Sequence, residues 1–524
     1  MPMSGVATSI SGVAVSATQA QNLIDSLATW PGVNDIGIEG QLGFGVGICP
    51  ALPAGFSAMA GTTDRASPNY GNYTYSDGSV MCWIPAFWYR IGHASNPSYA
   101  GWLLNSVDVV RYSTFANEAA ANAAGYALPR AFWNAGAVQL GFFVDKYHCS
   151  ANSGVASSLR YGNPLSTASA HNPIGSLTGA PANTYGGVFA AAKTRAARFF
   201  PAMRYMRAAL GLLVTAHAQA AASTAQCAWW DGSATGLAGP KGCNNNALRD
   251  TADTAVVYTS DGYSNAGKTG SGVPFEKTTH NGQASGVADL NGNMWEVSPG
   301  ITCVATTLTI TGAALTNPAR ITVTAHGLST GRQGRIDSLG GTTQLNGKIF
   351  TVTVVDANTL SLDGIDGTAF SAYTSGGTLT VGVFHALTTA ADAAALTGGN
   401  ALATDAWGAT GLAAHSAVLD VPWAAGQVYA LRYGASANQV LSPDTSGAGW
   451  SRTNLGLALP AGVGATGINT FGLDNYHQYI ANELCPIAGG NWDSGSVAGV
   501  WAVGWAGARS SSYADVGFRS ASYL

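Results

Sequence analysis

Charged residues are scarce in this chain. Only 10% of its 524 residues are charged, the formal net charge is −4, and no dense run of Lys or Arg occurs. Nucleic-acid binding leaves a basic patch or stripe, so the composition argues against a nucleic-acid partner. No stretch of eighteen or more apolar residues is present, so we expect no membrane-spanning helix.

Export and disulfide signals are equally sparse. The N-terminal sequence lacks both basic residues and a continuous apolar run, so it does not read as a signal peptide. Seven cysteines are widely spread with no C-x-x-C pair, which favours buried free thiols over a disulfide framework or a zinc site. Abundant Gly and aromatic residues exclude disorder and favour a β-rich, loop-rich fold typical of extracellular or virion proteins.

Catalytic patterns are also missing. Nine histidines are scattered, and none forms a His-x-x-x-His pair suited to a metal. His148 stands beside Cys149, but neighbours on a strand point to opposite faces, so we expect no nucleophile–base pair there. We therefore predict no catalytic residue and no resident metal or other cofactor.

Helical periodicity is confined to two places. Ser16 can cap a short helix over Ala17–Ala28, within a separate N-terminal segment, 1–45. The second place is 189–222, where Pro201 separates two helices. Its arginines are predicted to form a solvated or subunit-facing stripe; they are Arg195, Arg198, Arg204 and Arg207.

A composition shift near residue 303 marks an inserted unit. Residues 303–386 are rich in alternating Thr and Val, and turn signals such as Asn346-Gly347 punctuate them. The pattern predicts a small β-barrel or sandwich domain. It interrupts a larger domain, whose first part is 46–302 and whose second part is 387–524.

Four motifs in the larger domain resemble a known family. GVADLNGNMWEV at 286–297 and FFVDKYHCS at 142–150 are similar to strands of the formylglycine-generating-enzyme subfamily of the C-type lectin fold. GGNW at 489–492 and GFRSA at 517–521 are similar to its closing segments. The resemblance implies an α+β, C-type lectin-type domain. The enzymes' copper-binding cysteine pair follows the closing G-G-S-W, but Asn491–Arg519 contains no cysteine, so we do not expect an oxidase.

The acidic turn of this motif has two interpretations. Asp289, Asn291, Asn293 and Glu296 are oxygen-rich, and calcium binding is one reading. A hydrogen-bonded turn that locks Trp295 into the core is the interpretation we favour.

The closing segment, 489–524, resembles the variable region of proteins diversified by retroelements. Glycines, tryptophans and arginines form a regular frame, with Gly residues for tight turns and aromatic side chains as buried anchors. The scaffold residues are Trp295, Gly490, Trp492, Trp501, Arg509, Phe518 and Arg519. The family varies its interstitial positions from asparagine codons by adenine-directed mutagenesis, and ten residues fit the resulting restriction. These candidate receptor-binding residues are Asp493, Ser494, Val497, Gly504, Ala506, Gly507, Ser511, Tyr513, Ala514 and Asp515.

The resemblance implies a function without chemistry. The best-known relatives are receptor-binding tips of phage tail fibres, which implies a virion protein acting at the host cell surface. The implied partners are a bacterial surface protein or glycan, other phage tail or baseplate proteins at the N-terminus, and two further copies in a homotrimer. A diversified ligand-binding protein displayed on a bacterial surface is the alternative, and an enzyme on the formylglycine-generating scaffold ranks third.

Overall fold

The computed structural model describes most of the chain. It covers residues 32–230, 240–263, 265–398 and 476–524, together with a few short strands and single residues elsewhere. The helix expected over Ala17–Ala28 lies outside the described residues. The fold is mixed, with many antiparallel strands and few helices, which agrees with the expected α+β class.

A six-stranded antiparallel sheet forms one layer of the main body, in the order β13-β31-β10-β5-β4-β3. These strands are β3 (Phe56–Ala58), β4 (Asn72–Tyr75), β5 (Val80–Pro85), β10 (Gly141–Asp145), β13 (Phe200–Pro201) and β31 (Ser520–Ser522). The last strand, β31, lies between β10 and β13, with Phe143 opposite Ser522. The end of the chain therefore returns to the strand that carries the FFVDKYHCS motif.

A second six-stranded sheet carries much of the closing segment, in the order β23-β27-β29-β28-β14-β30. Its strands are β14 (Trp295–Val297), β23 (Gly426–Val428), β27 (Tyr476–Gln478), β28 (Ile487–Ala488), β29 (Val503–Trp505) and β30 (Val516–Gly517). Two of its pairings, β14 with β30 and β27 with β29, are parallel. The end of GVADLNGNMWEV, in β14, and the start of GFRSA, in β30, are thus paired in one sheet.

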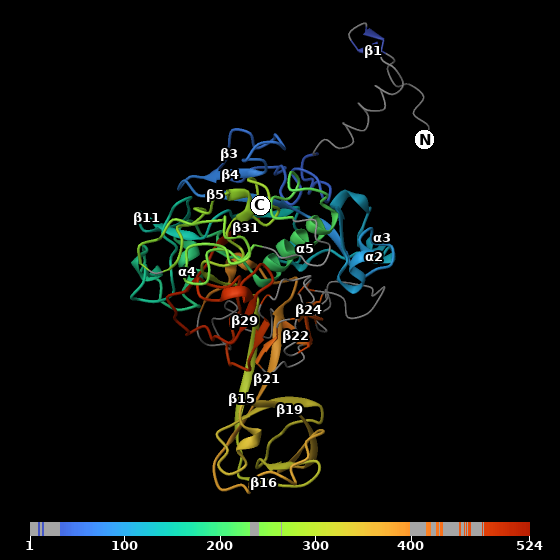
Figure 1. Ribbon diagram of the computed structural model, residues 1–524, viewed down its shortest axis with the longest axis vertical. Coiled ribbons are helices and arrows are strands. Elements are labelled where there is room, and N and C mark those ends of the chain that lie inside the picture. The colour runs from blue at the N-terminus through green and yellow to red at the C-terminus, as the bar shows by residue number, and fades with distance from the viewer. Residues whose placement is uncertain are drawn as a thin grey trace.

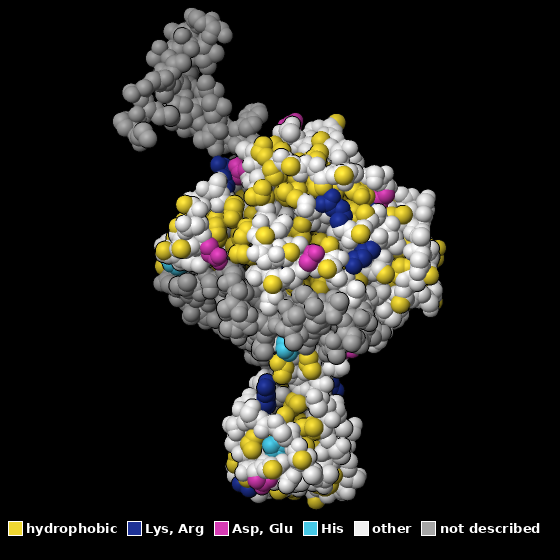
Figure 2. Space-filling model, turned by 180° about the vertical axis from the view of Figure 1, so that it is seen from behind, with side chains coloured by type: hydrophobic (Ala, Val, Ile, Leu, Met, Phe, Trp, Pro, Cys, Tyr) yellow, Lys and Arg dark blue, Asp and Glu magenta, His cyan; other side chains and the backbone are white. Residues whose placement is uncertain are grey.

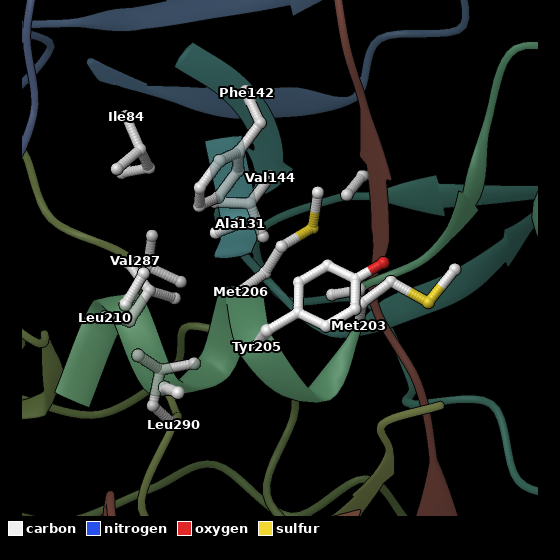
Figure 3. Packing of buried hydrophobic residues seen from close by; sticks show 14 of the residues in the cluster. Ile84, Ala131, Phe142, Val144, Met203, Tyr205, Met206, Leu210, Val287 and Leu290 are labelled. Carbon is white, nitrogen blue, oxygen red and sulfur yellow. The ribbon is translucent and has the colours of Figure 1, made fainter. Parts of the chain in front are cut away.

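Four α-helices are described: α2 (Tyr99–Trp102), α3 (Glu118–Ala123), α4 (Val188–Lys193) and α5 (Arg204–Ala220). Of these, α4 and α5 contribute buried residues to the core on the first sheet. Pro201 lies in β13 between α4 and α5, which confirms the predicted separation of two helices there. Figure 3 shows Met206 of α5 directed toward Phe142 and Val144, and Leu210 beside Val287, in the buried core.

Other described strands form two-stranded ribbons. They are β1 (Ser9–Ile10) with β2 (Val13–Ala14), β6 (Phe87–Ile91) with β7 (Val107–Arg111), β8 (Trp133–Asn134) with β9 (Ala137–Val138), β11 (Cys149–Asn152) with β12 (Val155–Ser158), and β24 (Ala430–Arg432) with β26 (Leu459–Gly462). The first of these, β1 with β2, lies apart from the main body (Figure 1). The aromatic run around Pro85 divides between β5 and β6 at Ala86. Strand β5 lies inside its sheet, between β4 and β10.

The inserted unit projects from the main body on two long strands, on the side away from β3 and β4 (Figure 1). We call β15 (Ile301–Thr309) and β21 (Thr378–Leu387) the stalk; they pair through nine residues each without a bulge. The rest of this sheet comprises β16 (Gly312–Ala314), β17 (Arg320–Thr322), β18 (Arg332–Asp337), β19 (Lys348–Asp356), β20 (Thr359–Leu362), β22 (Ser416–Asp420) and β25 (Trp450–Ser451). Thirteen buried apolar residues between Ile310 and Val381 form a core of their own. None of the described sheets closes into a barrel.

The boundary of the N-terminal segment at residue 45 needs correction. Ile36 and Phe44 are completely buried in the main core, and Asp35 pairs with Arg111 at 3.0 Å. A separate element cannot include them, so residues from about 33 onward belong to the main body.

The predicted arginine stripe is wrong. Arg195, Arg204 and Arg207 are buried, and Arg195 makes a bidentate pair with Asp145 at 2.6 and 3.0 Å. Helical spacing indicated a shared surface, but the carboxylates of Asp145 and Glu296, distant in sequence, pair with Arg195 and Arg207 inside the core.

The cysteine prediction is confirmed. All seven cysteines are buried and unbridged. Burial raises the pKa of the Cys82 thiol to about 11, as expected for an inert core residue. Among the described helices, none combines the length and apolar character needed to cross a membrane.

Candidate functional site

The frame of the closing segment is largely buried. Trp501 is 3% exposed, and Phe518 and Arg519 are fully buried, as expected for scaffold residues. Gly490 has φ +93°, and a Cβ there would lie 2.6 Å from the Ala498 side chain, so the position requires glycine. Arg509 is also buried.

Two scaffold tryptophans differ from the rest. Trp492 and Trp295 are only half-buried. Trp295 still packs against the main core, but Trp492 lies at the surface beside His171, with ring centroids 6.1 Å apart. The expectation that Trp492 is a buried anchor is therefore wrong.

Arg519 joins the end of the chain to the early motifs. Its guanidinium donates to the Asp145 carbonyl at 2.9 Å, to the Ala288 carbonyl at 2.7 Å and to Glu296 Oε1 at 2.9 Å. Arg207 lies 3.4 Å from the same carboxylate. One buried arginine thus holds the motif strands and the last strand in a single arrangement.

Glu296 is the centre of this buried charge cluster, with His148 Nε2 2.9 Å from its Oε1. Burial alone would raise the pKa of Glu296, but Arg207, Arg519 and His148 together hold it well below its usual value. The glutamate is therefore a permanent counter-ion rather than a proton donor.

His148 and Cys149 have separate partners, although His148 precedes the strand β11 that begins at Cys149. Cys149 Sγ donates to Asp145 Oδ2 at 3.2 Å, whereas His148 contacts Glu296. Burial and the Asp145 carboxylate raise the pKa of the Cys149 thiol well above its usual value. No feature of this pair favours nucleophilic chemistry.

The acidic turn is held by hydrogen bonds. Asp289 Oδ2 accepts from the Gly270 amide at 2.6 Å, and Asn293 bonds both backbone groups of Gly267 at 2.6 and 2.9 Å. Asn291 donates to the Pro240 carbonyl at 2.7 Å. Loops from 240 to 270 are therefore anchored on this turn, as the favoured interpretation predicts.

Few side-chain oxygens of the acidic turn are free to bind calcium. Asp289 Oδ1 and Asn291 Oδ1 are buried without a hydrogen-bond partner in the described structure, while Glu296 is engaged by cations. Calcium takes six to eight oxygen ligands. Within the described ranges, no group of three or more His, Cys, Asp or Glu side chains is arranged to hold a metal.

The exchangeable positions divide by exposure. Tyr513 is 55% exposed, and Asp493 and Ala506 are also exposed. Six others are half-buried in the loops between frame residues: Ser494, Val497, Gly507, Ser511, Ala514 and Asp515. Gly504 is buried inside β29, where a Cβ would approach Ile487 to 3.0 Å. Its expected place on the exposed face is wrong.

Tyr185 forms the floor beneath several of these positions. Its amide donates to the Ser511 carbonyl at 2.8 Å, and its ring lies 6.1 Å from that of Tyr513. A Cβ on Gly507 would lie 2.5 Å from the Tyr185 ring. Gly507 therefore tolerates a larger residue only if this tyrosine moves.

A carboxylate pair lies beside this floor. Asp515 Oδ2 accepts a hydrogen bond from Asn491 at 2.6 Å. Burial raises the pKa of Asp515 and the nearby Asp493 adds to the effect, while Asn491 and His171 act in the opposite direction. Two neighbouring carboxylates favour a ligand that supplies positive charge or hydroxyl donors.

Fixed residues outside the closing segment complete the face, and sequence reasoning missed them. The Asn246 amide donates to the Trp492 carbonyl at 2.6 Å, and Asn244 Oδ1 accepts from the Gly495 amide at 2.9 Å. His171 packs edge-on to Tyr263, which is 60% exposed, at 5.4 Å. No motif marks these residues, because they meet the closing segment only in the folded chain.

Comparison with known proteins adds no assignment. No protein-family model matches the chain, and no curated protein matches it significantly. We call the surface formed by the exposed Asp493, Tyr513 and Tyr263 and the half-buried Trp492 and Asp515 the C-terminal face.

Proposed function

We propose that the C-terminal face binds a molecule on the surface of a bacterium, and that the protein is the receptor-binding component of a phage tail fibre. The observation that carries this proposal is the division within one short segment. Buried frame residues such as Trp501 and Phe518 alternate with surface residues such as Asp493 and Tyr513. Such a division allows the surface to change while the fold is kept.

The chemistry of the face supports binding rather than catalysis. Exposed aromatic rings at Tyr513 and Tyr263 offer large contact area at low entropic cost, as in other binding surfaces. Asp493 and Asp515 supply acceptors for hydroxyl or cationic groups of a protein or glycan. The proposed action is reversible recognition without a chemical step.

A lectin-type fold is the finer structural proposal. Its support is the return of β31 to pair with β10, and the buried contacts of Arg519 with Glu296 that join the family-like motifs. In such a fold, the loops of the C-terminal face extend from a core that the last strand, β31, completes by pairing with β10. We propose that the inserted unit is a separate domain of the protein, because it has a hydrophobic core of its own.

A homotrimer is proposed because one face is too small for tight binding. Individual contacts of this size are weak, and linking several faces raises the effective affinity without new contacts. Sedimentation of the full chain measures the assembly directly. A mass three times that of the 53.2 kDa chain is expected, and a monomer at micromolar concentration contradicts the trimer.

Cell adsorption tests the binding function. Fluorescently labelled protein is offered to a panel of bacterial strains, and Tyr513→Ala is compared with Leu52→Ala. Leu52 is a matched control, 42% exposed and near β3. We expect the Tyr513 variant to lose about tenfold in adsorption to any strain bound, a typical hot-spot effect, and the control to lose nothing. Equal adsorption of both variants, or binding to no strain, contradicts the proposal.

The neighbouring DNA tests diversification separately. A near-copy of the codons for 489–524, with adenines at the exchangeable positions and a reverse-transcriptase gene beside it, is the expected finding. Codons at Asp493 and Tyr513 that match the copy without adenine differences contradict diversification while leaving receptor binding intact.

A further inference from the structure

The stalk carries an apolar groove that the proposed function does not use. A cavity of about 400 Å³ lies where the stalk enters the inserted unit. Its wall consists of residues on one face of the two strands: Val304, Thr306, Leu308, Val381 and Val383. Figure 2 shows hydrophobic side chains continuing from the stalk onto the lower lobe on the face seen from behind.

Strand geometry explains why these residues share a face. Side chains alternate along a strand, so Val304, Thr306 and Leu308 point the same way. The register places Val304 opposite Val383 and Thr306 opposite Val381, which extends the same face across both strands. Leu308 and Val383 are half-buried and Thr306 is exposed, so the wall is reachable from solvent.

The opposite wall is a fixed loop. His326 holds it, because its Nε2 lies 2.8 Å from the Asp356 carbonyl and its Nδ1 accepts from the Leu328 amide at 3.0 Å. Gly327, Leu328 and Ser329 then line the groove. A rigid, mostly apolar cavity of this volume is in the range of small-molecule sites.

The charge of the lining is one-sided. Arg332 is exposed at the rim and makes no ion pair within the described ranges, and none of the lining residues is acidic. Asp356, at the end of β19, has its carboxylate engaged by the Asn358 amide at 2.7 Å. A guanidinium beside an apolar wall selects an anionic group attached to an apolar body.

We propose that this groove binds a small organic anion with an apolar body, with the apolar part on the stalk face and the anionic group at Arg332. The site is independent of the C-terminal face and goes beyond the proposed receptor-binding function. It adds a second ligand class, bound where the stalk meets the inserted unit.

Three probes of equal chain length test the charge preference: octanoate, octanol and octylammonium, titrated calorimetrically into the full chain. We expect octanoate to bind saturably at one site and octylammonium to bind about tenfold more weakly, because only the carboxylate pairs with Arg332. Equal affinities for the two ions, or no saturable octanoate binding, overturn the proposal.

Two matched pairs of variants locate the site. Thr306→Phe fills the groove, whereas Thr307→Phe places the same ring on the opposite face of β15. Arg332→Gln removes the rim charge, whereas Arg320→Gln removes another exposed arginine of the same unit, in β17. We expect Thr306→Phe to abolish octanoate binding, Arg332→Gln to weaken it about fivefold, and both controls to leave it unchanged.

The second pair protects the test against misfolding. Disruption of the inserted unit by Thr306→Phe would be visible as faster hydrogen exchange across 310–381. In that case the comparison of Arg332→Gln with Arg320→Gln still tests the site. Equal octanoate affinity in Arg332→Gln and Arg320→Gln overturns the proposed site, whatever the phenylalanine variants do.

Discussion

The main body and the inserted unit are stabilised in different ways. The main body buries charged groups such as Asp145, Arg195 and Glu296 within its core. The core of the inserted unit is apolar, and no Asp, Glu, Lys or Arg is buried between Ile310 and Val381. The difference follows from their secondary structure, because long antiparallel strands satisfy their own backbone groups whereas irregular loops need side-chain anchors.

The comparison shows which interactions select a single arrangement of the loops in the main body. In the main body, Arg519 bonds backbone carbonyls of two loops and the Glu296 carboxylate at once, so one residue fixes several loops. Buried ion pairs add little net stability, but a wrong arrangement would leave charges unpaired. We infer that the body uses charge to select one loop arrangement, on which the C-terminal face depends.

Breaking the central pair has the largest expected effect. Glu296→Ala leaves Arg207 and Arg519 buried without their carboxylate, which costs about 4 kcal/mol of unfolding free energy. In the inserted unit, Asp337→Ala breaks the half-exposed pair with Arg335 and costs under about 1 kcal/mol. Urea unfolding followed by tryptophan fluorescence measures the first change, since 301–387 contains no tryptophan. A loss under about 1 kcal/mol for Glu296→Ala contradicts the role of charge.

A cavity in the inserted unit tests its independence. Leu360→Ala removes a fully buried side chain from its core and costs about 3 kcal/mol locally. Hydrogen exchange across 310–381 accelerates, while the tryptophan-monitored midpoint of the body stays unchanged. A parallel fall of that midpoint means that the two regions unfold as one.

Buried Lys146 gives the body a distinctive pH response. Its ammonium contacts only neutral oxygens, including Asn72 Oδ1 at 2.5 Å and the Ala284 carbonyl at 2.7 Å, and burial lowers its pKa to about 8 from 10.5. Between these values the unfolded chain binds more protons, so the lysine's contribution to stability rises with pH. The unfolding free energy of wild type minus that of Lys146→Met should rise by about 2 kcal/mol from pH 7.5 to 10. A flat difference rules out this shift.

Neighbouring positions on the C-terminal face give the smallest effects. Gly507→Ala forces a Cβ against Tyr185 and costs about 1 kcal/mol or slightly more. Ala506→Ser changes an exposed residue and stays within about 0.5 kcal/mol of wild type. Thermal unfolding of the two variants measures this difference. Equal stabilities would show that the Tyr185 ring moves aside without cost.

Local sequence patterns predicted local features well. Pro201 lies between two helices, as its missing amide donor predicted, and alternating Thr and Val predicted the strands of the inserted unit. The frame residues Phe518 and Arg519 are buried as expected. These features depend on neighbours in sequence or on motif likeness.

Long-range pairing escaped prediction. Arg195 reaches Asp145 fifty residues away, so helical spacing alone indicated a surface stripe. Gly504 is buried by strand pairing that a glycine cannot signal, and His171 meets Trp492 only through the fold. Receptor binding, the trimer and the lectin-type identity stay predictions.

The central claim is that the C-terminal face can change without loss of fold. A combined variant, Asp493→Asn, Tyr513→Asn and Asp515→Asn, returns three positions to the asparagine expected of the template. Adsorption to a bound strain and the tryptophan-monitored unfolding midpoint are measured on the same preparation. We expect adsorption to fall at least about tenfold while the unfolding free energy changes by less than about 1.5 kcal/mol. Unchanged adsorption with an intact fold contradicts the account.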